Sequence, residues 1–378
     1  MSKIQLAYIL PEYDAGTATH FAHLYDLLEL AAKDLDIHLI VERGMALGVD
    51  VERRKPFASV TVLNSGTWLG RLHEEYGVLA KLRAQGCERY YTHYSFSGAI
   101  AAGIVVRSYS GTSYYWNCGM PWLFTSKLSV HNLRGWLTTR LPLLLSLKLC
   151  TFCVTGIPGL ARMYSREYGI ATRKFKILPN LISLQRFGTP RPMALRQQQG
   201  IAEGAPIIIY IHRLSSRKGV DLLVPMAKEL RNRDAVIVVV GSGPYLKQLQ
   251  QDVSEAGLQN RFRLLGAVPN VDVPGLLAAS DLFLMPSREE GFPRVLLEAM
   301  ACGVPFVATD VGGVSEIVPP GSPLVPSEDV TAIAGAVDDL LDDESKRRQL
   351  ADEGKQWVKR YDLQIVAKQF VTLILNDN

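Results

Sequence analysis

Residues 286–303 read PSREEGFPRVLLEAMACG, the most informative stretch of this sequence. Pro293 suits the first turn of a helix, because its missing N–H group would have no partner there. Glu290 is therefore expected in the loop before a helix, and Glu298 about one turn inside it. The helix N-terminus between these carboxylates attracts anions through its free N–H groups and its dipole. The pattern predicts a ligand with hydroxyl groups on either side of phosphates, such as a nucleotide sugar.

Apolar strand-like segments alternate with helical patterns on both sides of this stretch. Such alternation is typical of parallel sheets covered by helices, so the predicted class is α/β. The second half predicts strands at 207–211, 236–240, 262–265, 282–285, 306–308 and 323–325, and helices at 220–231, 245–256, 273–279, 294–300, 330–341, 344–359 and 363–375. The first half predicts strands at 4–9, 37–41, 60–63, 90–92, 113–116 and 152–154, and helices at 18–33 and 97–107.

Pro, Gly and polar residues interrupt the alternation at 188–206. Such composition is typical of a linker, and 378 residues suggest about two domains. We expect an N-terminal domain at 1–185, a linker at 186–205 and a C-terminal domain at 206–361. The last helix, within 362–378, is expected to turn back onto the first domain.

The charge of this chain is unevenly distributed, although the net value is only +4. No Asp or Glu occurs between Arg89 and Arg166, whereas that region carries eight Lys and Arg residues. A long region of one sign suggests an anionic partner. Solvated surface with a few helix-end cations is the alternative. No nucleic-acid-binding motif accompanies the basic region, so we expect no nucleic-acid partner.

The five cysteines indicate reduced thiols in a cytosolic setting, since their number is odd and the chain is too large to need disulfides. Cys150 and Cys153 form a C-x-x-C, but no second pair or nearby His supports a metal site. The N-terminus enters a strand pattern directly, without a signal peptide. The apolar run at 141–147 is too short to span a bilayer. We therefore expect a cytoplasmic protein.

Two cations follow the first strand of the second half, in the sequence IIIYIHRLSSRKG (207–219). Ligands of open α/β sheets bind at the carboxyl ends of strands, where Arg213 and Lys218 are expected. A guanidinium can grip phosphate oxygens in pairs, and an ammonium adds a point charge. Solvated loop charges are the alternative. Gly241 and Gly243 follow the next strand and indicate either a tight turn or close approach to a nucleotide.

Residues 207–318 resemble the nucleotide-binding domain of retaining GT-B glycosyltransferases of family GT4, also called glycosyl transferases group 1. The matching pieces are Arg213-Leu214 with Lys218-Gly219, Gly241-x-Gly243-Pro244, Ala279-Ser280-Asp281, Pro286-Ser287, Glu290-Gly291-Phe292, Glu298 to Gly303, and Pro305 through Gly312-Gly313 to Glu316. The first domain resembles the family more loosely, through residues 4–33 and 164–180. The resemblance implies two Rossmann-like doubly wound domains that face each other across a cleft.

The resemblance also implies a role for each matching residue. Arg213 and Lys218 would hold the donor diphosphate and stabilise it as the leaving group, Glu298 would bind the ribose hydroxyls, and Glu290 would lie near the donor sugar. The remaining implied donor-binding residues are Gly16, Gly241, Val268, Gly291, Phe292, Pro293, Val295 and Leu296. A plain helix-entry glycine is the alternative for Gly16.

Two polar residues of the first domain are also candidates. Asn117 stands where many family members carry a histidine near the reaction centre. It can hydrogen-bond a sugar hydroxyl or a developing charge, so we include it among the catalytic candidates, but it cannot titrate near neutral pH. His93, at the end of an earlier strand, is the acceptor-binding candidate. A packed or capping histidine is the alternative.

The implied reaction moves a sugar from UDP-sugar or GDP-sugar to an acceptor hydroxyl with retention of configuration, in polysaccharide or glycolipid assembly. The family needs no bound metal or other cofactor, because Arg and Lys neutralise the diphosphate. A non-catalytic nucleotide-sugar-binding protein and a GT-B sugar-nucleotide epimerase are the alternatives. A nicotinamide oxidoreductase is disfavoured, since the first domain lacks the dinucleotide glycine fingerprint.

Peripheral contact with an anionic membrane is one interpretation of the acid-free region. Its basic and aromatic residues are interleaved with the apolar run LPLLLSLKL, and they include Trp122, Phe124, Lys127, Arg134, Trp136, Arg140 and Lys148. Such content suits docking on an anionic bilayer, and would point to a lipid-linked acceptor. A core helix with a cationic edge is the alternative.

Overall fold

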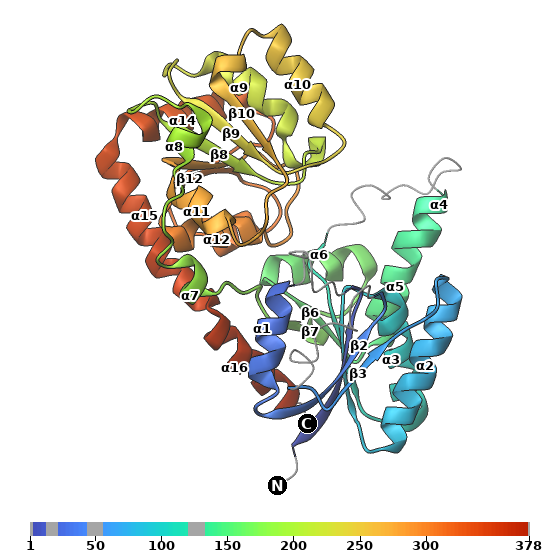
Figure 1. The fold of residues 1–378 in the computed structure, drawn as a ribbon. Coiled ribbons are helices and arrows are strands. Elements are labelled where there is room, and N and C mark those ends of the chain that lie inside the picture. The colour runs from blue at the N-terminus through green and yellow to red at the C-terminus, as the bar shows by residue number, and fades with distance from the viewer. Residues whose placement is uncertain (1–2, 13–21, 44–55, 120–132, 377–378) are drawn as a thin grey trace. The chain divides into compact units, whose positions relative to one another are not determined.

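The computed structural model describes residues 3–12, 22–43, 56–119 and 133–376 (Figure 1). Its internal contacts divide the chain into two compact units. The first unit comprises Met1–Pro179 and Leu363–Asn378, and the second comprises Asn180–Asp362. The C-terminal segment therefore belongs to the first unit, where helix α16 (Leu363–Leu375) packs against α1 (Ala22–Ala31).

The first unit is built on one parallel sheet of seven strands in the order β3-β2-β1-β4-β5-β6-β7. Its central strands are apolar and buried on both faces, as parallel sheets covered by helices require. The strands are β1 (Ile4–Leu10), β2 (Leu35–Val41), β3 (Ser59–Val62), β4 (Arg89–His93), β5 (Thr112–Trp116), β6 (Phe152–Thr155) and β7 (Phe175–Ile177).

Helices cover both faces of this sheet (Figure 1). Under α16, Tyr8, Tyr91 and Tyr114 stack across neighbouring strands, and the Phe370 ring meets Tyr91 edge-on at 5.1 Å. Besides α1 and α16, the helices are α2 (Trp68–Ala84), α3 (Phe96–Tyr109), α4 (Leu133–Gly135), the π-helical η4 (Trp136–Arg140), α5 (Leu141–Leu149) and α6 (Pro158–Tyr168).

The second unit has a parallel sheet of six strands in the order β10-β9-β8-β11-β12-β13. The strand order reverses between β8 and β11, which is the switch point at which doubly wound sheets bind ligands. The strands are β8 (Ile207–Ile211), β9 (Val236–Val240), β10 (Phe262–Gly266), β11 (Leu282–Met285), β12 (Phe306–Thr309) and β13 (Leu324–Val325). Both units are thus Rossmann-like, and the expected α/β class is confirmed.

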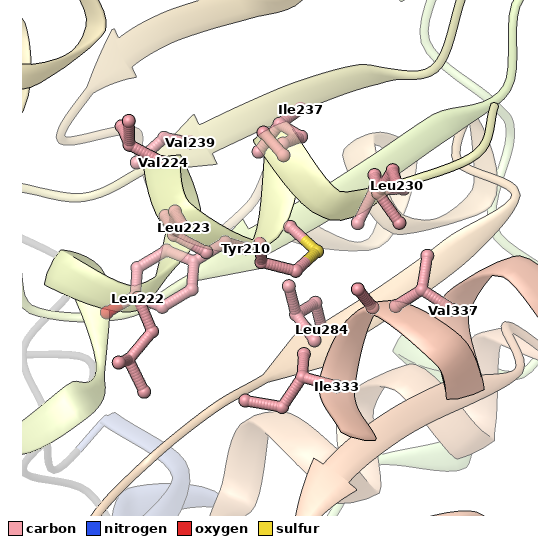
Figure 2. Packing of buried hydrophobic residues seen from close by; sticks show 14 of the residues in the cluster. Tyr210, Leu222, Leu223, Val224, Leu230, Ile237, Val239, Leu284, Ile333 and Val337 are labelled. Atoms are coloured by element: carbon pink, nitrogen blue, oxygen red, sulfur yellow. The ribbon is translucent and has the colours of Figure 1, made fainter. Parts of the chain in front are cut away.

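A continuous apolar core joins the second sheet to its helices (Figure 2). Tyr210 and Ile237 on the strands pack with Leu223 of α9 and with Ile333 and Val337 of α14. The helices are α7 (Leu184–Phe187), α8 (Leu195–Gln199), α9 (Leu223–Glu229), α10 (Leu246–Glu255), α11 (Val273–Ala278), α12 (Arg294–Cys302), α13 (Val314–Ile317), α14 (Val330–Asp342) and α15 (Glu344–Val358).

The segment 186–205, in which we expected a linker, is packed onto the second unit. The N–H group of Met193 donates to Gly275 O at 3.0 Å, and Arg196 Nη2 donates to Asp281 Oδ2 at 3.1 Å. Leu195 of α8 is buried. The polar, Pro-rich composition indicates that this segment forms little secondary structure. Composition alone cannot predict the long-range contacts that hold the segment on the second unit.

Helix α2 is the longest element of the first unit that the sequence pattern did not predict. It contains Gly70 and Gly77, which are poor helix formers, and few regularly spaced apolar residues. Thr67 caps it by accepting a hydrogen bond from Gly70 N–H at 3.2 Å, and α2 packs along α3. Tertiary packing thus stabilises a helix that its local sequence barely indicates.

Among the helices of the described residues, none combines the length and apolar character that crossing a bilayer requires.

Candidate functional site

Two charged loops meet at the switch point of the second sheet. Residues 212–219 follow β8, and residues 286–293 follow β11. The loops touch at Gly219, where φ is +67° and a Cβ atom would lie 1.9 Å from Pro286 O. Glycine adopts this conformation readily and leaves room for the contact. Close approach of the two backbones therefore brings the charged side chains of both loops together.

Glu290 lies at the centre of this site and is only 5% exposed. Its Oε1 atom accepts hydrogen bonds from Lys218 Nζ at 2.6 Å and from Ser287 Oγ at 2.8 Å. His212 Nε2 lies 3.4 Å from the same oxygen, without the geometry of a hydrogen bond. The other carboxylate oxygen, Oε2, forms no hydrogen bond with the described residues. One oxygen is therefore fixed by the protein, and the second is available to a ligand.

The protonation states of this cluster follow from burial and charge. Burial alone would raise the pKa of Glu290, but the positive charges around it and the hydrogen bonds from Lys218 and Ser287 leave that pKa below its ordinary value. Burial lowers the pKa of His212 to about 4, and Lys218 and Arg217 oppose its protonation further. At neutral pH His212 is uncharged, so Lys218 is the cation that balances the Glu290 carboxylate.

Lys218 and Arg213 have contrasting environments. The Lys218 carbonyl accepts a hydrogen bond from the buried Tyr210 hydroxyl at 3.1 Å, and Lys218 Nζ also lies 3.4 Å from Glu289 O. Lys218 is therefore anchored at both ends, with one of its three ammonium protons uncommitted. Arg213 is exposed and forms no hydrogen bond or ion pair with the described part of the chain. Its five donors remain available.

Helix α12 begins directly after the loop that carries Glu290. Pro293 occupies the N-cap position, and Val295 and Leu296 lie in the first turn. Glu298 follows one turn into the helix, is 7% exposed, and accepts a hydrogen bond from Arg294 Nη2 at 3.3 Å. Burial raises the pKa of Glu298. The structure thus places Glu290 before the N-terminus of α12 and Glu298 about one turn after it, as the sequence predicts.

The turn that joins Glu290 to α12 is held in place by packing. The carbonyl of Phe292 accepts a hydrogen bond from Asn180 Nδ2 at 3.2 Å, and the Phe292 ring meets Tyr361 edge-on at 5.6 Å. Phe292 and Pro293 are buried, and Gly291 is half-buried. The backbone groups of this turn therefore have fixed directions.

Gly241, predicted to bind donor, has a structural reason to be glycine. Its φ is +134°, and a Cβ atom would lie 1.9 Å from His212 O. Gly243 similarly contacts Leu214, whose N–H group donates to Ser242 O at 2.9 Å. These contacts support the turn after β8. Val268, in the loop after β10, is half-buried.

Asn117 lies at the end of β5, and its side chain is engaged within the first unit. Its Nδ2 donates to the Tyr115 hydroxyl at 2.7 Å, while its Oδ1 accepts from Gly119 N–H and from the Tyr164 hydroxyl, both at 2.8 Å. These bonds fix the start of the loop that follows β5. The arrangement indicates that Asn117 fixes residues 117–119, and its carbonyl oxygen already has two donors.

His93 is buried among aromatic rings rather than open to solvent. It stacks on Trp116 at a centroid distance of 4.1 Å, and its Nδ1 atom lies 3.2 Å from the Tyr8 hydroxyl. This environment agrees with the alternative that His93 is a packed histidine. Gly16, the remaining candidate of the first domain, lies outside the described residues.

Sequence reasoning missed His212 and Ser287 as members of the site. His212 stands immediately before Arg213 at a strand end, and Ser287 lies three residues before Glu290. Those positions were the available signals, but only folding brings both side chains to the same carboxylate oxygen. Within the described residues, no group of three His, Cys, Asp or Glu side chains has the arrangement of a metal site.

Comparison with known proteins finds matches to about half of the chain. Residues 193–357 match the family model "Glycosyl transferases group 1". The chain is 37% identical over 194 residues to a GDP-mannose-dependent alpha-(1-6)-phosphatidylinositol monomannoside mannosyltransferase of Mycolicibacterium smegmatis, covering 48% of this chain and 50% of the relative. It is 35% identical over 183 residues to N-acetyl-alpha-D-glucosaminyl L-malate synthase of Bacillus anthracis, covering 47% and 48%. The matches span about half the length of these relatives.

Solved structures resemble the chain over nearly its whole length. HepE of Anabaena, solved in complex with UDP and glucose, has a TM-score of 0.78 at 20% identity, covering 98% of this chain and 99% of HepE. Sucrose-phosphate synthase of Thermosynechococcus elongatus has a TM-score of 0.81 at 20% identity, covering 98% of each chain. At such identities the likeness concerns the fold alone. The protein therefore has the GT-B fold, and its residues 193–357 match the model of the glycosyl transferases group 1 family.

Proposed function

We propose that this protein is a retaining glycosyltransferase that moves a sugar from a nucleoside diphosphate sugar to an acceptor hydroxyl. The observation that supports this most directly is the geometry of Glu290. A buried carboxylate with one oxygen held by Lys218 and Ser287, and the other without a partner in the described residues, is prepared to accept a hydrogen bond from a ligand. A sugar hydroxyl is a suitable donor for that bond.

Lys218, which contacts Glu290, and Arg213, which lies in the same loop after β8, suit the diphosphate of the donor. Arg213 can present its guanidinium to two phosphate oxygens, and the uncommitted ammonium proton of Lys218 can reach a third. As the bond between the sugar and the phosphate breaks, negative charge grows on the diphosphate, and the two cations stabilise it. Each such group is expected to stabilise the transition state by on the order of a few kcal/mol. No metal ion is needed in this scheme.

The remainder of the donor fits the elements around these loops. The N-terminal turn of α12, which contains Val295 and Leu296, offers its dipole and the Val295 N–H group to phosphate. Glu298, one turn further along, is prepared to bind the ribose hydroxyls. Burial raises its pKa although Arg294 and Arg186 lower it, and two ribose hydroxyl donors would compensate the carboxylate for its burial. Donor binding would thus engage both carboxylates and the helix terminus between them.

We further propose that the acceptor is a glycan or a glycolipid at the cytoplasmic face of a membrane. One relative named above acts on phosphatidylinositol monomannoside, whereas another makes a malate glycoside, so relatives by name include lipid and small acceptors. Exposed apolar and basic side chains on η4 and its neighbours α4 and α5 support peripheral contact with an anionic bilayer. They are Leu133, Arg134, Leu137, Leu145 and Lys148. Trp122, Phe124 and Lys127 lie outside the described residues.

Two measurements test the proposed reaction. Isothermal titration calorimetry with UDP, GDP, UDP-glucose and GDP-mannose should show specific binding that Arg213→Ala weakens. Incubation of the bound donor with acceptor mixtures should yield a glycoside with the donor's anomeric configuration, detected by proton NMR.

The outcomes separate the alternatives. Transfer or donor hydrolysis that disappears in Glu290→Ala excludes a non-catalytic binding protein. Conversion of the donor sugar without an acceptor would instead identify an epimerase. Absence of binding by all four nucleotides would refute the proposal.

A further inference from the structure

Three side chains from two loops converge on a single carboxylate oxygen. Lys218 and Ser287 donate to Glu290 Oε1, and His212 Nε2 lies 3.4 Å away from it. His212 Nε2 is enclosed by protein and forms no hydrogen bond. A buried ring nitrogen that faces a carboxylate without bonding to it is unusual, because such a nitrogen carries a desolvation penalty.

The charges around His212 explain why it stays neutral in the ligand-free protein. Glu290 favours its protonation, but Lys218 and Arg217 from its own loop oppose it, and the neighbouring Tyr210 carries no charge. Glu290 is already balanced by Lys218 at 2.6 Å. A second cation on the same oxygen would leave the cluster with a net positive charge in a buried place.

A bound diphosphate changes this balance. Its oxygens compete with Glu290 for Lys218, so the carboxylate loses part of its countercharge. The ligand's own negative charge also neutralises the cations that oppose protonation of the imidazole. His212 Nε2, which forms no hydrogen bond, then lies 3.4 Å from Glu290 Oε1 and can take the place of Lys218.

We propose that His212 takes up a proton when a nucleotide sugar binds and replaces Lys218 as the cationic partner of Glu290. The proton comes from the buffer and adds to the neutral ring, so no other bond is made or broken. His212 is thus a positioning residue: it keeps the Glu290 carboxylate charged and oriented while Lys218 holds phosphate. This inference rests on the proposed function, since it requires a diphosphate at Lys218.

The test measures proton uptake directly. UDP-glucose and GDP-mannose are the probes, because a diphosphate diester has no group that titrates between pH 5 and 8. Each is titrated calorimetrically into the full chain at pH 6.5 in two buffers of different ionisation enthalpy. The difference in apparent enthalpy gives the number of protons bound. We expect uptake of about 0.5–1 proton in the wild-type chain, and affinity that rises about 4–30-fold from pH 7.5 to pH 6.0.

His212→Asn and His212→Gln should still bind the nucleotide sugar, with no proton uptake and no such pH dependence. Lys228→Ala, on the exposed side of α9, is the control and should behave as wild type. If a variant does not fold, the wild-type chain labelled with ¹³C-histidine provides a second readout: the His212 resonance should report a neutral ring in the free protein and a protonated ring in the complex at pH 6.5.

Three outcomes would count against the inference. Binding of a probe to the wild-type chain without proton uptake overturns it and leaves the proposed function standing. Equal uptake in the wild type and both His212 variants overturns it as well, because another group would then take the proton. Binding of neither probe overturns the proposed function, and this inference with it.

Discussion

Arg213 and Lys218 are both cations in the loop after β8. Their surroundings differ, so removing each charge should affect the stability of the protein differently. Arg213 is exposed and has no partner in the described residues, so the fold does not depend on its charge. Lys218 balances a buried carboxylate at 2.6 Å, so the fold does depend on its charge. Ligand binding and stability can therefore be separated at the level of single residues.

Arg213→Ala should weaken nucleoside diphosphate binding without destabilising the protein. Loss of a charged hydrogen-bonding group to phosphate is expected to lower affinity about 10–100-fold. The free energy of unfolding should change by no more than about 0.5 kcal/mol, because no intramolecular contact is lost. Calorimetric titration and urea unfolding measure the two quantities. A destabilisation of several kcal/mol would show that Arg213 has a structural role.

Lys218→Met should destabilise the second unit by about 3 kcal/mol, because it leaves the Glu290 carboxylate buried without its cation. Adding Glu290→Gln removes that unbalanced charge, so the double variant should be more stable than Lys218→Met alone. Urea unfolding of the two single variants and the double variant gives the coupling energy between the side chains. Additive effects would mean that the ion pair contributes nothing to stability.

At the scale of elements, glycines rather than charged residues determine how closely the loops of the site approach. Gly219 and Gly241 both have positive φ, and both face a carbonyl oxygen that a Cβ atom would reach at 1.9 Å. Gly257, after α10, has the same φ as Gly219, +67°, but nothing lies within 4 Å of its Cβ position. An alanine at Gly257 would therefore meet backbone strain alone, whereas an alanine at Gly219 would meet both backbone strain and a steric clash.

Gly219→Ala should cost considerably more than Gly257→Ala. At Gly257 only the positive φ opposes alanine, which costs about 1–2 kcal/mol. At Gly219 the clash with Pro286 O is added, so the loops must separate and Lys218 moves away from Glu290. We expect Gly219→Ala to lose about twice the unfolding free energy of Gly257→Ala and to lose nucleotide binding. Similar losses for both variants, measured by urea unfolding, would contradict this account.

At the scale of the whole molecule, the first unit contains a buried acid pair that the proposed reaction does not use. Glu75 of α2 is 0% exposed and lies beside Glu42, which follows β2. Neither oxygen of Glu75 has a hydrogen-bond partner of standard geometry. Burial and the neighbouring Glu42 raise the pKa of Glu75 to about 9. Glu75 therefore carries a proton at neutral pH in the folded protein.

Stability of the first unit should consequently fall as pH rises from about 5 to 8. In the unfolded chain Glu75 ionises near its ordinary pKa, so in this range the folded state binds more protons than the unfolded state, and alkali favours unfolding. We expect a loss of about 4 kcal/mol between pH 5 and 8, since nearly one proton is released on unfolding across this range. Glu75→Gln, which keeps the shape and cannot ionise, should remove most of this dependence.

Tryptophan fluorescence during urea unfolding at several pH values measures this effect. Trp357 is the only tryptophan of the sequence within the second unit, so the signal reports mainly the first unit. An equal pH dependence in Glu75→Gln and wild type would assign the effect to other groups.

Local pattern alone determined the fold class and most elements of this protein. Apolar runs such as 207–211 and 236–240 were predicted with the bounds that the structure has, because strands buried on both faces must be apolar throughout. Pro293 marked the start of α12 because a proline has no N–H group to lose there. The spacing of Glu290 and Glu298 around that turn is likewise a local property, so the sequence alone indicated both site carboxylates.

Only the tertiary structure decided which partners these groups have. Lys218 and Glu290 are 72 residues apart in the sequence and share a hydrogen bond, because the strand order places β8 beside β11. The same long-range packing buries His212 against Glu290, engages Asn117 with Tyr115 and Tyr164, stabilises α2, and draws 186–205 onto the second unit. The burial of a side chain and the charges around it depend on neighbours that are distant in sequence. A local sequence pattern cannot predict those neighbours.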